Sequence, residues 1–235
     1  MKILRLLWPS ALIVSLAWGA QKPDSPVLRW AEGQPGCTFS ADDDGRYRYG
    51  LWTDTFGVVL AVDSQELEKS IRRTVPTFAI LLTFHQRGSG ALPVKPASIT
   101  LEFVKHEHNL QNAIDPDALT GEFQREAAES DEETQREIAK HPSRTVEMQA
   151  ELEAHKKDVE QMVAFIKTRS LREVRLDSAH PAAEGWVFFH ARNKWIGDWN
   201  KQEELVLRMS VADREVEFPF LLPPSKGDFL LRRRP

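Results

Sequence analysis

The pattern of hydrophobic and polar residues changes twice along the chain. Residues 76–104 and 184–221, called here the two β regions, alternate apolar and polar side chains in short runs, as half-buried β-strands do. Between them, residues 115–169 are highly charged and carry apolar side chains at helical spacing. The pattern therefore predicts a β domain with a helical segment inserted into it.

Short strands separated by turn signals are predicted on both sides of this segment. The run FGVVLAV at Phe56–Val62 is almost wholly apolar and indicates a central strand. Asp44-Gly45 lies between two β-prone stretches and predicts a hairpin, because glycine adopts positive φ without steric cost. About seven regularly spaced strands are typical of a β-sandwich. Residues 37–112 and 170–224 would together form that domain.

Two helices separated by a break are predicted within residues 113–169. Asp115 followed by Pro116 is a helix-start signal, because aspartate caps free N–H groups and proline fits the first helical position. Pro142 disfavours helix at the preceding residue and ends the first helix. The second helix repeats apolar residues every seven positions: Leu152, Val159 and Ile166. This spacing is typical of coiled coils, so a hairpin of two helices is expected, each about 25 residues or roughly 37 Å long.

The first residues resemble a secretory signal peptide in their order of parts. Within residues 1–20, Lys2 and Arg5 precede a largely apolar run from Leu6 to Trp18, and small residues follow. A run of 13 residues is short for a transmembrane span. We therefore expect a cleaved signal, an exported protein in the periplasm or outside the cell, and no stable membrane span after cleavage. An uncleaved N-terminal anchor is the alternative.

Composition and charge narrow the class of protein further. The chain has 235 residues, of which 41% are hydrophobic and 28% charged, with a net charge of −4. These values suit a soluble globular domain and offer no basic field for nucleic acid. The stretch 115–169 holds 14 acidic and 8 basic residues, a net charge of −6. Residues 21–36 are predicted to be a Pro- and Gly-rich linker, and residues 225–235 a basic tail.

Cys37 is the only cysteine in the sequence. An intramolecular disulfide is therefore impossible, even in an oxidising compartment. The thiol would either pack as a small apolar side chain or pair with a second chain.

The strands of the two β regions carry a resemblance to a known class of domain. FAILLTFHQ at Phe78–Gln86 is followed by a loop and by PASITL at Pro96–Leu101. Later GWVFF at Gly185–Phe189 precedes the alternating strand Glu204–Val211. This order resembles secreted bacterial immunoglobulin-like (telokin-like) β-sandwich domains. The resemblance implies a mainly β fold, an immunoglobulin-like antiparallel β-sandwich carrying the two-helix hairpin, and an export route. It carries over no active site.

His106 and His108 are the strongest candidates for metal ligands. On a strand they would share one face with Glu102, since side chains alternate across a strand. Two imidazoles and a carboxylate are suitable ligands for Zn²⁺. Such a site would make the protein a metal-dependent hydrolase. No further ligand follows at a strong spacing, and a solvated strand end explains the same residues.

Trp195 and Trp199 lie in a polar loop and are candidates for a platform that stacks against a sugar or a peptide. The alternative is that they anchor the loop to the core. The sequence contains no Gly-x-Ser-x-Gly, His-Glu-x-x-His or Gly-rich phosphate-binding motif. We therefore expect no catalytic residue and no cofactor.

A non-catalytic binding module is favoured over the hydrolase. A two-helix insert with a thin apolar stripe must pack on its own sandwich, pair with a second copy or receive a partner. Residues 115–169 are therefore predicted to be the recognition or self-association element, contacting a protein. Replacing them by a Gly/Ser linker should leave a folded sandwich and abolish association.

Overall fold

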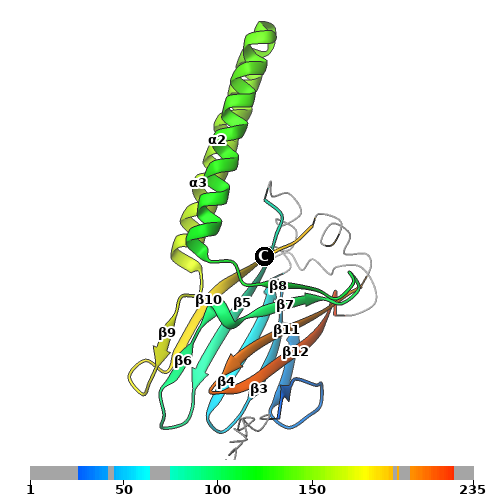
Figure 1. Ribbon diagram of the computed structural model, residues 1–235, viewed down its shortest axis with the longest axis vertical. Coiled ribbons are helices and arrows are strands. Elements are labelled where there is room, and N and C mark those ends of the chain that lie inside the picture. The colour runs from blue at the N-terminus through cyan, green and yellow to red at the C-terminus, as the bar shows by residue number, and fades with distance from the viewer. Residues whose placement is uncertain (1–25, 42–44, 64–74, 193–194, 196–201, 225–235) are drawn as a thin grey trace, which may run out of the picture.

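Two β-sheets pack face to face, and a hairpin of two long helices projects from them (Figure 1). The computed structural model describes residues 26–41, 45–63, 75–192, 195 and 202–224. The prediction of a mainly β chain with two helices is confirmed. Within the described ranges, no helix has both the length and the apolar character needed to cross a bilayer. The predicted signal peptide and basic tail lie outside these ranges.

The first sheet has the strand order β1-β12-β11-β7-β8. Its strands are β1 (Leu28–Arg29), β7 (Thr100–Phe103), β8 (Asn109–Asn112), β11 (Glu203–Val211) and β12 (Arg214–Leu222). All neighbours are antiparallel except β1, which runs parallel to β12. Because β1 and the buried Trp30 belong to the body of the domain, residues 28–30 of the predicted linker 21–36 are part of the sandwich.

The second sheet is antiparallel and has the order β10-β5-β4-β3-β2. Its strands are β2 (Cys37–Ala41), β3 (Arg46–Trp52), β4 (Phe56–Asp63), β5 (Thr77–Gln86) and β10 (Ala182–His190). The strands β2 and β3 pair on either side of Gly45, whose φ is +78°, as the Asp-Gly signal predicts. A small third sheet joins β6 (Leu92–Val94) to β9 (Val174–Leu176), and a 3-10 turn spans Pro96–Ser98.

The strand β5 shows how the second sheet is buried on both faces. Phe78, Ile80 and Leu82 point into the core between the two sheets and have no exposed surface. Ala79 and Leu81 point to the opposite face, where they are also buried. A strand with two buried faces is apolar almost throughout, and such a strand needs a cover on its outer side.

The helical hairpin supplies this cover. It consists of α2 (Pro116–Lys140), a 3-10 turn (Pro142–Arg144) and α3 (Thr145–Arg169). The helix start at Pro116 and the break before Pro142 lie where the sequence predicts them. The hairpin extends away from the sandwich, and only its root lies near the strands (Figure 1).

Candidate functional site

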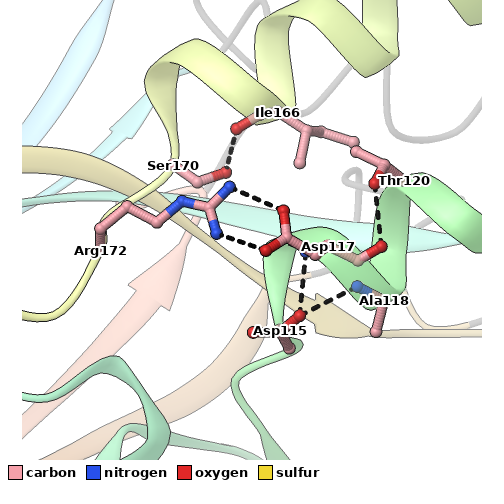
Figure 2. A network of polar contacts seen from close by, with 7 residues as sticks. All are labelled: Asp115, Asp117, Ala118, Thr120, Ile166, Ser170 and Arg172. Carbon is pink, nitrogen blue, oxygen red and sulfur yellow. Dashed lines mark hydrogen bonds and ion pairs between the residues drawn. The ribbon is translucent and has the colours of Figure 1, made fainter.

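The first turn of α2 is fixed by its own sequence. One oxygen of Asp115, Oδ1, accepts hydrogen bonds from the backbone N–H groups of Asp117 (3.0 Å) and Ala118 (2.9 Å) (Figure 2). Pro116 follows at the first helical position, where a missing N–H costs nothing. The Thr120 hydroxyl donates to the carbonyl of Asp117 at 2.9 Å. The position at which α2 begins is therefore set locally.

An ion pair joins the two ends of the hairpin. The guanidinium of Arg172 donates two hydrogen bonds of 3.0 Å to the carboxylate of Asp117 (Figure 2). This pair lowers the pKa of Asp117 and raises that of Arg172, because each charge is more stable beside the other. The Ser170 hydroxyl donates to the Ile166 carbonyl at 2.5 Å, which satisfies an acceptor in the last turn of α3. The start of α2 and the end of α3 are thus stabilised at the same place.

Backbone hydrogen bonds attach both ends of the hairpin to β10. The N–H of Ile114, just before α2, donates to the Phe188 carbonyl at 2.8 Å. The N–H of Leu171, just after α3, donates to the Trp186 carbonyl at 2.9 Å. Gly185 permits this second approach, because a Cβ at that position would overlap the backbone of Leu171. The hairpin is therefore joined to one strand at two points.

Apolar packing seals the root of the hairpin onto the second sheet. We call residues 116–123 of α2 and 159–169 of α3 the hairpin base. Its buried apolar side chains contact the outward-facing side chains of β5 and β10: Leu119, Phe123, Val159, Val163 and Ile166 from the helices, with Ala79, Leu81, Trp186 and Phe188 from the strands. The ring of Phe165 adds a contact to Trp186 with centroids 5.7 Å apart. The base is therefore a second hydrophobic core.

Beyond the base the hairpin loses its apolar character. We call residues 124–158 the arm; α2 alone continues there for roughly 25 Å at 1.5 Å per residue. Across the arm, all of which the structure describes, only Leu152 is buried. Polar and charged side chains bridge the two helices instead. Nε2 of His155 lies 3.5 Å from Oε2 of Glu126, and Nζ of Lys156 lies 3.2 Å from Oδ2 of Asp131.

The surface of the arm is polar and mainly acidic. It contains 10 acidic and 6 basic residues. Among the described residues of the arm, Val146 is the only large hydrophobic side chain that is strongly exposed, at 82%. Since an apolar outer stripe is missing here, association through the arm would be electrostatic rather than hydrophobic.

The expectation for His106 and His108 is wrong in its premise, because the strand ends before them. The strand β7 stops at Phe103, and the chain turns back through residues 104–108 into β8. Glu107 and His108 adopt φ of 59° and 54°, a left-handed conformation that strands do not have. The two imidazoles consequently do not alternate with a strand.

Each histidine meets a different carboxylate. Nδ1 of His108 lies 2.5 Å from Oε1 of Glu102, whereas Nε2 of His106 lies 3.3 Å from Oε2 of Glu203. The hydrogen bond from His108 is the main reason why the pKa of Glu102 is lowered, and Arg208 adds to it. Within the described ranges, no three His, Cys, Asp or Glu side chains gather as a metal site would require. The structure thus brings Glu102 and His108 together and leaves His106 apart.

Of the two tryptophans predicted to form a platform, the structure describes Trp195. Trp195 is 7% exposed and stacks on His106, with centroids 5.3 Å apart and planes inclined by 22°. It also contacts Phe103 at 5.0 Å. Trp195 therefore packs into the main core, as the alternative to the predicted platform expects. Trp199 lies outside the described residues. Cys37 is a free thiol, partly buried against the main core.

Sequence reasoning misses Arg172 and Gly185, which hold the hairpin to the domain. The sequence does contain a signal for Arg172. An inserted segment leaves and re-enters its host domain at neighbouring points. Opposite charges just inside one end of the insertion and just beyond its other end are therefore expected to meet. Asp117 and Arg172 fit this description. Gly185, within an otherwise bulky strand, signals a close backbone approach.

Comparisons with known proteins add no family. No protein-family model matches the chain, and no curated protein matches it. Among solved structures, it is similar to a candidate lipoprotein (ycdA) from Bacillus subtilis, with 10% sequence identity and a TM-score of 0.34. The match covers 83% of this chain and 41% of that one, so this chain spans less than half of the neighbour's length. Similarity at this level assigns neither fold family nor function.

Proposed function

We propose that the protein is an exported, non-catalytic binding module that presents its helical arm to a protein partner. The observation that carries the proposal is the contrast between the two parts of the hairpin. The base contributes five buried side chains to the second core, whereas the arm beyond it has one buried side chain. A hairpin that only covered the sheet would end near Ala127 and His155. The arm therefore serves a purpose outside the sandwich.

The charge of the arm favours a partner with a basic surface over a second copy of the chain. The arm has a net charge of −4 from its 10 acidic and 6 basic residues. Two arms lying together would repel each other, whereas a basic surface would be attracted from a distance. Because Val146 is the only large apolar side chain that is strongly exposed on the described arm, the association should depend on charge and weaken as salt screens it.

The proposal includes the class of the sandwich and its destination. The neighbouring strands β12, β11, β7 and β8 follow the order G-F-C-C′ of one sheet of a variable-type immunoglobulin domain, which supports an immunoglobulin-like sandwich. The other sheet departs from that pattern, because β2 and β3 extend it beyond β4. Export to the periplasm or the cell exterior rests on the signal-like residues 1–20.

The decisive experiment shortens the arm and keeps the base. Replacing residues 128–154 by a four-residue glycine-rich turn preserves Leu119, Phe123 and Val159 against the sheet. Removal of the whole insertion 115–169 is a poorer test, because it would expose Trp186 and Phe188. A photo-reactive amino acid at Val146, near the tip, then captures what the arm touches in the source cells.

The expected result is an adduct with one basic protein, formed from Val146 and suppressed by high salt. Once purified, that protein should bind the full chain but not the short-arm variant. The short-arm variant should unfold at the same urea concentration as a full-length control that carries Val146→Ala. Arm-to-arm adducts would instead make the hairpin a self-association element. Equal binding by the short-arm variant would overturn the proposal.

A further inference from the structure

An aromatic groove opens at the edge of the sandwich, on a different surface from the hairpin. It has a volume of about 370 Å³ and lies where β12 of the first sheet meets β2 and β3 of the second. Six of its lining residues are aromatic or acidic: Trp30, Glu32, Phe39, Tyr49, Glu204 and Phe220. They come from distant parts of the sequence, so no local sequence motif predicts the groove. The hairpin, by contrast, packs on β10 and β5.

Four aromatic rings form a continuous wall of the groove. Tyr49 is at its centre and contacts Trp30, Phe39 and Phe220, with centroid distances of 5.1, 5.0 and 5.6 Å. Trp30, Tyr49 and Phe220 are buried, whereas Phe39 is 39% exposed and forms the rim. The wall is thus rooted in the core and offers one ring to a ligand.

The polar ends of these rings are already bonded, which holds the wall in place. The Trp30 indole N–H donates to the Thr38 carbonyl at 3.1 Å, and the Tyr49 hydroxyl donates to the Leu221 carbonyl at 3.4 Å. Burial raises the pKa of Tyr49, and the charges of Tyr47 and Glu32 raise it further, so its hydroxyl stays a donor. A preformed aromatic surface loses little entropy when it binds a ligand.

The strand that borders the groove is poorly suited to pair with another strand. The short strand β1 pairs with β12 only at Val216 and Glu217. The Glu217 carbonyl faces that side, so positions 219 and 221 face it too. Pro219 has no N–H to donate, and the Leu221 carbonyl already accepts from Tyr49. A ligand here would use side-chain contacts rather than a backbone ladder.

The charges that line the groove are all negative. Glu32 and Glu204 are both exposed, and no basic residue lines the described part of the groove. A cation between these carboxylates and the aromatic rings would gain from both, by Coulomb attraction and by contact with the ring faces. The ligand is therefore expected to carry a basic residue beside apolar ones.

We propose that this groove binds an extended, proline-containing segment of a partner protein that carries a basic residue. A polyproline II segment has no internal hydrogen bonds, needs no backbone ladder and is stiff before binding, so aromatic grooves recognise it at low entropic cost. The exposed ring of Phe39 at the rim of the aromatic wall packs against a proline ring, and Glu32 with Glu204 receives the basic side chain. The proposal stands independently of the arm.

The test measures binding of a short labelled peptide, with proline at every third position and a terminal arginine, by fluorescence polarisation. The full-length mature chain should bind it, and rising salt should weaken the complex. Phe39→Ala should weaken binding about tenfold, as truncation of an exposed anchor does. Glu32→Lys should weaken it by a similar factor. Leu110→Ala, a truncation of another exposed apolar side chain on β8, should leave binding unchanged.

Matched peptides and one truncation decide between occupants. Replacing the terminal arginine by glutamate, or the prolines by glycine, should abolish the signal. Equal binding of these peptides, or unchanged binding by both Phe39→Ala and Glu32→Lys, overturns the proposal. Binding that appears only in a chain ending at Pro224 overturns the assignment to a partner, because the chain's own basic residues 225–235 would then be the occupant.

Discussion

Arg172, three residues beyond the end of α3, holds the carboxylate of Asp117 in the first turn of α2 with two hydrogen bonds of 3.0 Å. The two residues are 55 positions apart in the sequence, yet they close the point at which the hairpin leaves and re-enters the sandwich. This ion pair and the apolar packing of the hairpin base hold the polar arm in a fixed position on the sandwich.

Arg172→Ala should loosen the first turn of α2 at neutral pH. The pair lowers the pKa of Asp117 in the folded state. Its stabilisation is therefore present above the ordinary pKa of an aspartate, about 3.9, and is lost as the pH falls through the lowered value. Amide hydrogen exchange in residues 117–121 should be faster in the variant at pH 7, and the difference should vanish in acid.

Arg136→Ala is the matched control for this effect. It removes the same charge from an ion pair with Glu132, which lies on the arm away from the base. The exchange of residues 117–121 should not respond to it. If both variants change that exchange equally, the effect is one of overall charge and the Asp117 contact does not hold the helix.

Ile166→Ala should destabilise the whole domain, because Ile166 has no exposed surface in the second core. Deleting a buried isoleucine side chain to alanine costs about 2–5 kcal/mol. Urea unfolding measures the loss. Val146→Ala, on the exposed arm, should change the free energy of unfolding by no more than about 0.5 kcal/mol. A small effect at Ile166 would mean that the sheet does not depend on its helical cover.

Two glycine substitutions should act in opposite directions. Gly185→Ala would drive a methyl group into the backbone of Leu171, so it should lower the thermal midpoint and weaken the attachment of α3. Gly121→Ala adds a methyl group with nothing within 4 Å inside α2, so it should stabilise the protein by about 0.5–1 kcal/mol. Thermal unfolding of both variants checks the pair. Stabilisation by Gly185→Ala would show that the close approach is not needed.

The hairpin was predictable because its signals are local. Asp115 and Pro116 start a helix by capping and by ring geometry, and Pro142 ends one by steric clash, whatever surrounds them. The sequence also contains a signal for the surface on which the hairpin packs. The run FAILLTFHQ is apolar at consecutive positions, and a strand with Leu81 and Leu82 both buried needs cover on both faces.

The candidate sites were harder because they depend on turns and on distant contacts. The alternating pattern of β7 suggested a strand through His108, but Glu107 and His108 take a left-handed conformation that few non-glycine residues adopt. The aromatic groove joins Trp30, Tyr49 and Phe220, which only the pairing of two sheets brings together. The hydrophobic pattern predicts that each of these residues is buried, but it does not determine which residues each one contacts in the fold.

The contribution of Arg208 to the stability of the first sheet should depend on pH. It contacts two largely buried carboxylates, Glu102 at 2.5 Å and Glu217 at 2.7 Å. Arg208→Met would leave both without this cation and cost about 1–3 kcal/mol at pH 7. Hydrogen bonds from His108 and Arg208 lower the pKa of Glu102, so the difference from wild type should be full above about pH 5 and shrink in acid. Urea unfolding across pH tests this, with exposed Arg175→Met as control; a pH-independent loss would contradict it.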